Sequence, residues 1–181
     1  SIESDLVLTS GEQVTIGLLS AELNNKGIKS IPLLGWQVPI ITDDNHEKAK
    51  ILNIDSKRLH KYFVKNDVIV LAGFQGISLD GRITSLGRGG SDTTAVAIAS
   101  SVDAERCDIY TDVDGVYSAD PNIDKKAKKI NKLSYEEMLE MASTGAKVLH
   151  TRSVELAMKN NLTLQVLSSL TKEKGTLIVN E

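Results

Sequence analysis

The sequence predicts an α/β fold: a three-layer α/β/α sandwich with a mainly parallel sheet. Patterns typical of helices alternate with patterns typical of strands along the 181 residues, which indicates a layered α/β architecture. Residues 68–73 read Val-Ile-Val-Leu-Ala-Gly without a polar side chain, as expected for a strand that is covered on both faces. No internal repeat or long linker interrupts the pattern, so we expect one domain of ordinary size.

The expected helices show apolar residues at three-to-four spacing or a recognisable start signal. Ser91 and Asp92 can cap one helix at its amino terminus, and Ser134 and Glu137 have the spacing of a capping box in another. The predicted helices are 14–23, ending near 25–27; 56–66; 91–101; 134–141; and 144–160.

The expected strands are short apolar runs, at 29–34, 68–73, 107–111, 163–167 and 176–179. In folds of this class, ligands bind at the carboxyl ends of the strands, where the turns lie. Three turns follow or adjoin the predicted strands, at 73–76, 87–92 and 111–115. We expect the chemistry of the protein there.

Composition and charge argue against several functions. Apolar residues make up 41% and charged residues 25%, as in soluble globular proteins, and no apolar run approaches the length of a membrane span. The net charge of −3 does not provide the basic field that nucleic-acid binding needs. The first residues do not read as a secretory signal, and a single cysteine fits a reducing cytosol. We therefore expect a cytoplasmic protein with no nucleic-acid and no membrane partner.

Thiol and zinc chemistry are not expected. Cys107 lies among apolar and strand-forming residues, which favours a buried structural thiol. One cysteine and three scattered histidines, His46, His60 and His150, offer no spacing for a zinc site. The basic run 125–129 is interpreted as a solvated loop or helix start.

The most informative segment is 85–95, which reads Ser-Leu-Gly-Arg-Gly-Gly-Ser-Asp-Thr-Thr-Ala. Its glycines free the backbone to point N–H groups at an anion, and the positive end of the following helix favours the same ligand. Arg88 adds a planar fork suited to a carboxylate or phosphate. A glycine-rich turn is often only a tight turn, but Arg88 and Asp92 have no packing reason to be there. The spacing matches neither the P-loop nor the dinucleotide fingerprint.

Segment 88–92, taken with 111–117 and 119–121, resembles the amino acid kinase family. With 10–12 (Ser-Gly-Glu) and 145–150 (Gly-Ala-Lys-Val-Leu-His), the complete set is similar to the aspartate kinases. The motifs follow the order of that family and cover nearly the whole chain. The resemblance implies transfer of the γ-phosphoryl group of ATP to the side-chain carboxylate of L-aspartate, giving 4-phospho-L-aspartate. That reaction is the first step towards lysine and diaminopimelate, threonine and methionine.

The resemblance also implies an acceptor site and two catalytic positions, Arg88 and Asp92. The substrate-binding residues that it implies are Glu12, Phe74, Arg88, Gly89, Gly90 and Ser91. Glu12 at the mouth of its expected helix could instead be a simple helix-terminal charge, and Phe74 could be a core residue. For Ser91 and Asp92, a capping role is compatible with the functional one.

On the nucleotide side, the resemblance implies ATP contacts from Thr111, Asp112, Tyr117 and Lys147. Outside its motif, Lys147 would read as a solvated helix lysine. Asn122 stands where the family often has an arginine, so a phosphate contact from that position is not expected. Magnesium is implied by ATP. Asp92 and Asp112 could orient its waters or a cationic side chain, and no direct metal ligand is assigned.

The implied reaction needs no general base, because a side-chain carboxylate is already ionised at neutral pH. Catalysis then consists of placing two anions together and stabilising charge on the transferring group. A site of glycines, hydroxyls, Arg, Lys and Asp meets that need, and His150 is interpreted as structural.

Members of the family begin with a Lys-Phe-Gly-Gly-like strand and loop and continue into regulatory ACT domains; neither occurs here. We therefore expect residues 1–181 to be the C-terminal majority of one catalytic domain, with little or no activity alone, and a homodimer as is usual in the family. Two alternatives stay open. One is another family member, acting on glutamate, acetylglutamate, uridylate or carbamate, although Glu12 with Arg88 favours a free amino acid. The other is a non-catalytic regulatory subunit that binds an amino acid.

Overall fold

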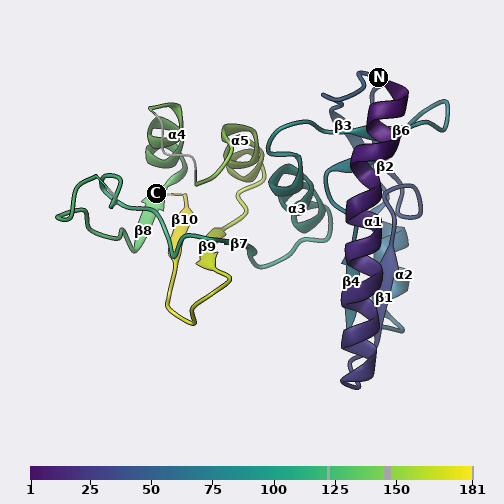
Figure 1. Ribbon diagram of the computed structural model, residues 1–181, viewed down its shortest axis with the longest axis horizontal. Coiled ribbons are helices and arrows are strands. Elements are labelled where there is room, and N and C mark those ends of the chain that lie inside the picture. Colours follow the sequence, from purple (N-terminus) through teal and green to yellow (C-terminus); the bar gives the residue numbers. More distant parts are fainter. Residues whose placement is uncertain (122, 145–147, 181) are drawn as a thin grey trace. The chain divides into compact units, whose positions relative to one another are not determined.

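The computed structural model describes residues 1–121, 123–144 and 148–180. The chain forms two compact units, Ser1–Thr94 and Ala95–Glu181 (Figure 1). Helices and strands alternate in both, so the predicted α/β class is confirmed. The assignment of the whole chain to one catalytic domain stays a prediction. Among the described residues, no helix combines the length and apolar character that a membrane crossing needs.

The first unit contains two small sheets beside a long helix. Helix α1 (Ile2–Asn25) packs against β1 and β6, and α2 (Ser56–Phe63) precedes β4. In the two-stranded sheet, β1 (Ser30–Leu33) pairs in parallel with β4 (Val68–Leu71). The four-stranded sheet has the order β3 (Ile51–Ile54), β2 (Ile40–Thr42), β5 (Gln75–Ser78) and β6 (Ile83–Ser85). Helix α3 (Gly90–Ser101) begins in this unit.

Helix α1 ends where the sequence predicts, at Asn25, but it begins at Ile2 instead of residue 14. The reason is that its packed face is largely polar. Asp5, Thr9 and Ser20 are buried on that face, whereas apolar side chains such as Val7 are exposed. An apolar periodicity therefore does not mark the first half of the helix.

The second unit has a four-stranded sheet with two helices. The strand order is β7 (Cys107–Thr111), β9 (Leu164–Ser168), β10 (Thr176–Val179) and β8 (Lys132–Ser134). Helices α4 (Tyr135–Ser143) and α5 (Thr151–Lys159) pack against each other. The core is aliphatic apart from Tyr135 and two sulfur side chains, and Cys107 is buried within it, as predicted.

Among the described strands, four pairs are parallel and three antiparallel, which agrees with a mainly parallel arrangement. The predicted strands are all present within two residues of their expected bounds. Five further strands were not predicted: β2, β3, β5, β6 and β8, each of three or four residues.

Two further differences from prediction concern residues 144–160 and the start of α3. The expected continuous helix 144–160 is wrong, because α4 ends at Ser143 and α5 begins only at Thr151. At the first break, the Thr144 hydroxyl donates back to the main-chain oxygen of Glu140 at 3.0 Å, an alternative to helical continuation.

The second difference is at α3, which begins at Gly90, so Ser91 and Asp92 lie in its first turn and do not cap it. The main-chain N–H of Thr93 donates to Gly89 O at 3.0 Å, which places the start before both. The capping box of α4 is confirmed. Ser134 Oγ accepts the Glu137 N–H at 3.2 Å, and the Glu137 carboxylate accepts the Ser134 N–H at 2.8 Å.

Candidate active site

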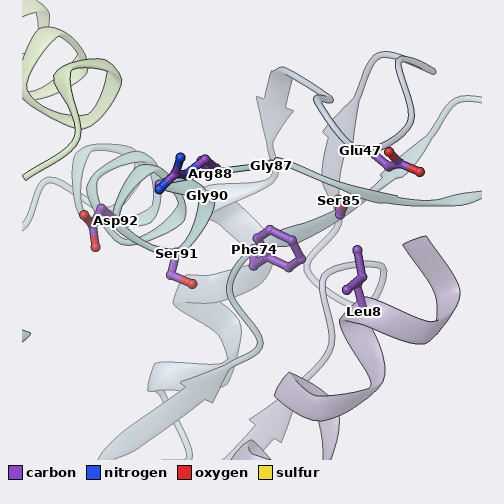
Figure 2. A pocket seen from close by; sticks show the side chains of 10 residues that line it. Leu8, Glu47, Phe74, Ser85, Gly87, Arg88, Gly90, Ser91 and Asp92 are labelled. Atoms are coloured by element: carbon purple, nitrogen blue, oxygen red, sulfur yellow. The ribbon is translucent and has the colours of Figure 1, made fainter. Parts of the chain in front are cut away.

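A cavity of about 430 Å³ in the first unit brings together most of the predicted acceptor-side residues. Six of them line it: Phe74, Arg88, Gly89, Gly90, Ser91 and Asp92. Four more lining residues are Leu8, Glu47, Ser85 and Gly87. Figure 2 shows the Phe74 ring between Leu8 of α1 and the amino end of α3. Segments far apart in the sequence therefore meet around the glycine-rich turn.

The glycine-rich turn (residues 87–90) needs its glycines for conformation and for space. Gly87 and Gly89 have φ angles of 71° and 69°, a region that favours glycine. A Cβ on Gly87 would lie 2.6 Å from the main-chain oxygen of Glu47. A Cβ on Gly90 would lie 2.8 Å from Phe74 Cδ2. The turn is thus packed tightly on both sides, and its path is fixed by its neighbours.

Arg88 is the exposed cation of this cavity. Within the described parts of the chain, its guanidinium forms no hydrogen bond or ion pair, so its planar fork is available to a ligand. Asp92 is half-buried in the first turn of α3, where the helix dipole favours a negative charge. The amino end of α3 also favours an anionic ligand.

Phe74 adopts a left-handed backbone conformation, with φ 65°. Such a conformation costs on the order of 1–3 kcal/mol for a bulky residue. Two main-chain hydrogen bonds hold it. The Phe74 N–H donates to Thr94 Oγ1 at 3.0 Å, and the Phe74 carbonyl oxygen accepts the Leu86 N–H at 3.0 Å. Phe74 is half-buried and lines the cavity, so it is not the fully buried core residue of the alternative interpretation.

The sequence suggested that Glu12 lies at the mouth of a helix, but the structure does not place it there. It is half-buried in the middle of α1, because that helix starts ten residues earlier. It is not among the residues that line the cavity. It follows Leu8 by four residues, which places both side chains on one face of the helix.

A second cavity, of about 1180 Å³, lies in the second unit at the carboxyl ends of β7 and β9. It is lined by three predicted nucleotide-side residues, Thr111, Asp112 and Tyr117. Thr111 and Ser168 are register partners on these parallel strands, so the cavity has the position expected for a ligand in an α/β fold. The predicted contact Lys147 lies outside the described residues, as does Asn122.

An ion-pair cluster not found from the sequence lies beside this cavity. Lys129 Nζ is 3.1 Å from Asp114 Oδ2 and 3.1 Å from Glu173 Oε2, and the Tyr117 hydroxyl donates to Asp114 at 3.0 Å. Lys125 is exposed, as predicted for the basic run, but Lys129 is not. The interpretation of that run as wholly solvated is therefore wrong at Lys129.

The same cluster shifts the ionisation of its members. Burial raises the pKa of Asp114, but hydrogen bonds from Lys129 and Tyr117 more than offset this and hold it below its ordinary value. Hydrogen bonding to Asp114 raises the pKa of Lys129 and that of Tyr117. At neutral pH, Asp114 is therefore a carboxylate that orients the Tyr117 ring at the cavity wall.

Comparison with known proteins identifies the family of the chain. The amino acid kinase family profile matches residues 1–168. The chain is 50% identical to the aspartokinase of Geobacillus stearothermophilus over 99% of its own length and 44% of that protein. It is 51% identical to the aspartate kinase of Pseudomonas fluorescens, of which it covers 43%. The chain thus spans less than half the length of these relatives.

Solved structures show the same relationship. The structure of E. coli aspartokinase III in complex with aspartate and ADP matches 99% of this chain and 41% of that one, with a TM-score of 0.89 and 32% identity. The aspartate kinase of Synechocystis matches 99% of this chain and 29% of that one, with a TM-score of 0.87 and 42% identity. Since the family profile covers most of the sequence and the fold agrees, the chain belongs to the amino acid kinase family.

Proposed function

We propose that this chain is the acceptor- and nucleotide-binding part of an aspartate kinase, which transfers the γ-phosphoryl group of ATP to the side-chain carboxylate of L-aspartate. The observation that carries the proposal is the cavity around Arg88, where six acceptor-side residues predicted from the sequence come together. The 50% identity to an aspartokinase supports the choice of substrate.

The acceptor half of the proposal rests on charge and shape. Arg88 offers a guanidinium without a partner among the described residues, and a carboxylate matches its two-pronged geometry. Phe74 supplies an apolar wall that limits the size of the acceptor. Ser91 supplies an exposed hydroxyl in the first turn of α3. Glu12, one helical turn after Leu8, is the carboxylate that we assign to the α-ammonium group.

The nucleotide half rests on the larger cavity. Thr111 is the last residue of strand β7 and Asp112 follows it; the Thr111 hydroxyl donates to Asp112 at 3.1 Å. Tyr117 is fixed by Asp114. We assign Thr111, Asp112 and Tyr117 to ATP, together with Lys147 on the strength of its motif.

Magnesium is expected to accompany ATP. In the described part of the chain, no three His, Cys, Asp or Glu side chains lie close enough together to hold a metal. One or two carboxylates are enough for a magnesium ion that keeps the triphosphate oxygens and several waters as ligands. We propose that Asp112, exposed at the cavity, or Asp92 orients such a water. When bound, the ion neutralises charge on the triphosphate.

In this mechanism, the residues of the chain position and neutralise charge. The acceptor carboxylate is ionised at neutral pH, so no side chain removes a proton from it. Arg88 and the amino end of α3 hold the acceptor and reduce its repulsion from the triphosphate. Phe74 and Leu8 exclude water from one side of the cavity.

The test is an assay of the full-length protein with ATP and magnesium, which follows ADP release and traps the acyl phosphate with hydroxylamine. Release of ADP that depends on L-aspartate supports the proposal. Turnover with glutamate, acetylglutamate, uridylate or carbamate instead would identify a different family member. Calorimetry separates the remaining case, because a non-catalytic amino-acid sensor binds aspartate but not ATP.

The sharpest variant is Arg88→Ala. Loss of a charge-assisted pair costs about 2–4 kcal/mol, so the aspartate KM should rise roughly 30- to 900-fold. Arg82→Ala is the matched control, because Arg82 is exposed in the turn between β5 and β6 and does not line the cavity. An unchanged aspartate KM in Arg88→Ala would refute the assignment of Arg88.

A further inference from the structure

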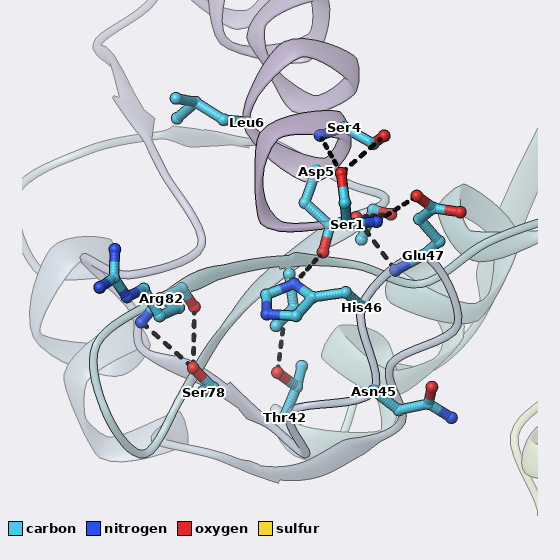
Figure 3. Close-up of polar contacts among 12 residues, drawn as sticks. Ser1, Ser4, Asp5, Leu6, Thr42, Asn45, His46, Glu47, Ser78 and Arg82 are labelled. Carbon is cyan, nitrogen blue, oxygen red and sulfur yellow. Dashed lines mark hydrogen bonds and ion pairs between the residues drawn. The ribbon is translucent and has the colours of Figure 1, made fainter.

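A buried carboxylate lies directly behind the glycine-rich turn. Asp5, near the start of α1, is 0% exposed. Its Oδ1 accepts the Ser85 hydroxyl at 2.6 Å and the main-chain N–H of Glu47 at 3.0 Å. Its Oδ2 lies 2.5 Å from His46 Nδ1. Figure 3 shows Asp5 between His46 and Glu47.

The groups bound to Asp5 support the turn from two sides. Ser85 precedes Gly87 by two residues at the end of β6, and it lines the cavity. Glu47 also lines the cavity, and its main-chain oxygen occupies the space that a side chain on Gly87 would need. A further main-chain bond, from Ala49 N–H to Ser85 O at 3.0 Å, ties the two segments together.

The backbone of Glu47 has a strained conformation. Its φ angle of 67° lies in the left-handed region, which is uncommon for a non-glycine residue and costs free energy. Its N–H donates to Asp5, which is fully buried. A buried polar group without a hydrogen-bond partner would cost free energy. Asp5 therefore stabilises the conformation that brings Glu47 against Gly87.

Asp5 is ionised at neutral pH. Burial raises its pKa, but hydrogen bonds from Ser85, His46 and the Glu47 main chain outweigh burial and lower the pKa below its ordinary value. A buried carboxylate is tolerated only when its oxygens are paired in this way. Its partners come from residues 46–47 and from the end of β6, so Asp5 joins three segments at one point.

We propose that Asp5 is a positioning residue of the acceptor site, which holds Ser85 and Glu47 so that the glycine-rich turn presents Arg88 to the substrate carboxylate. This inference rests on the proposed function and goes beyond it, because Asp5 does not line the cavity itself. Asp5 acts through Ser85, through the Glu47 main chain and through His46. The acceptor, not the nucleotide, should be sensitive to its loss.

The test is Asp5→Asn in the full-length protein, which keeps the shape of the side chain but removes its charge. The kcat/KM for aspartate should fall about 10- to 100-fold, as expected for a misplaced binding group, while the KM for ATP stays within about twofold. Asp80→Asn is the matched control, because Asp80 also accepts a serine hydroxyl, from Ser78, but lies in the exposed turn between β5 and β6. Equal losses for aspartate and ATP would overturn the proposal.

A second measurement does not depend on turnover. Amide hydrogen exchange over residues 85–93 should be faster in Asp5→Asn than in the wild type and in Asp80→Asn. If the wild type shows no aspartate-dependent ADP release, the proposed function fails, while the exchange experiment still tests the positioning role. Unchanged exchange in the turn would overturn that role.

Two single variants cover the case in which Asp5→Asn folds poorly. Ser85→Ala and His46→Gln each remove one partner of Asp5 and leave its carboxylate in place. If Asp5 acts through these partners, each variant should lower the kcat/KM for aspartate and leave the KM for ATP within about twofold. Wild-type aspartate kinetics in both variants would contradict the proposal.

Discussion

The hydroxyl of Thr94 accepts the main-chain N–H of Phe74 at 3.0 Å and donates to the main-chain oxygen of Gly90 at 2.7 Å. One buried hydroxyl therefore connects the first turns of α3 with the turn after β4. Phe74 needs such a partner, because its φ angle of 65° is unfavourable for an aromatic residue. This connection supports the Phe74 side of the cavity around Arg88.

Thr94→Val should weaken that connection. The substitution keeps the shape of the side chain but leaves the partly buried Phe74 N–H without its acceptor, at a cost of about 1–3 kcal/mol. We expect that loss in the free energy of unfolding, measured by urea denaturation, and a higher aspartate KM. Thr15→Val is the control, because the Thr15 hydroxyl donates to Gly11 O at 2.9 Å on the exposed side of α1. A Thr94→Val protein as stable as Thr15→Val would contradict the role of this hydroxyl.

Gly90→Ala should disturb the same region by crowding. The added Cβ would lie 2.8 Å from Phe74 Cδ2 and 2.9 Å from Leu86 Cβ, closer than side chains approach one another. Overpacking of this kind costs about 1–3 kcal/mol, and we expect thermal unfolding at a lower temperature together with weaker aspartate binding. In contrast, Gly17→Ala places its Cβ in open space within α1. That variant should be more stable by about 0.5–1 kcal/mol, and the opposite order of the two variants would refute the packing argument.

Much of the fold could be predicted because its signals are local. The capping box of Ser134 and Glu137 needs only two side chains at a fixed spacing, and the structure contains both of its hydrogen bonds. Strand β4 is recognisable in the sequence as an uninterrupted apolar run. The first half of α1 could not be found in this way, because Asp5 and Thr9 occupy its packed face. Those polar residues are buried by partners distant in sequence, which no local pattern reports.

In the candidate site, too, some residues could be predicted from the sequence and others could not. Arg88 and its glycines stood out because charge and backbone freedom in one turn indicate anion binding. Glu47 was missed because it contributes a main-chain oxygen, which is the same for every residue type. Leu8 was missed because it lies 66 residues before Phe74, and an exposed leucine carries no chemical signal. Lys129 was interpreted as one of several solvated lysines, since only the folded chain shows its two carboxylate partners.

Lys129→Met should affect the second cavity, to which we assign ATP. Without the ammonium group, Asp114 loses an ion pair and its pKa rises towards the ordinary value. The hydrogen bond that Asp114 accepts from the Tyr117 hydroxyl then weakens. The pair is partly exposed, so the stability change should be at most about 1 kcal/mol. We expect a severalfold weaker affinity for ATP by calorimetry with no change in aspartate affinity. Lys126→Met, an exposed neighbour in the same loop, is the control and should bind ATP as the wild type does.

Acid should unfold the protein partly through Asp5. Because its pKa is lower in the folded chain than its ordinary value of about 3.9, ionised Asp5 stabilises the fold above that value. The stabilisation is lost as the pH falls through the folded-state pKa. The groups that hydrogen-bond to the Asp5 carboxylate are the His46 imidazole, the Ser85 hydroxyl and the Glu47 main chain, so His46→Gln serves as the background that removes the imidazole.

In that His46→Gln background, the Asp5→Asn substitution should lower the free energy of unfolding by the same amount from pH 7 to about 5. The loss should shrink below about pH 4, where the Asp5 carboxylate begins to bind a proton, as urea denaturation at each pH would measure. A loss that grows as the pH falls would mean that the folded chain favours the protonated carboxyl. The network behind the glycine-rich turn would then need another explanation.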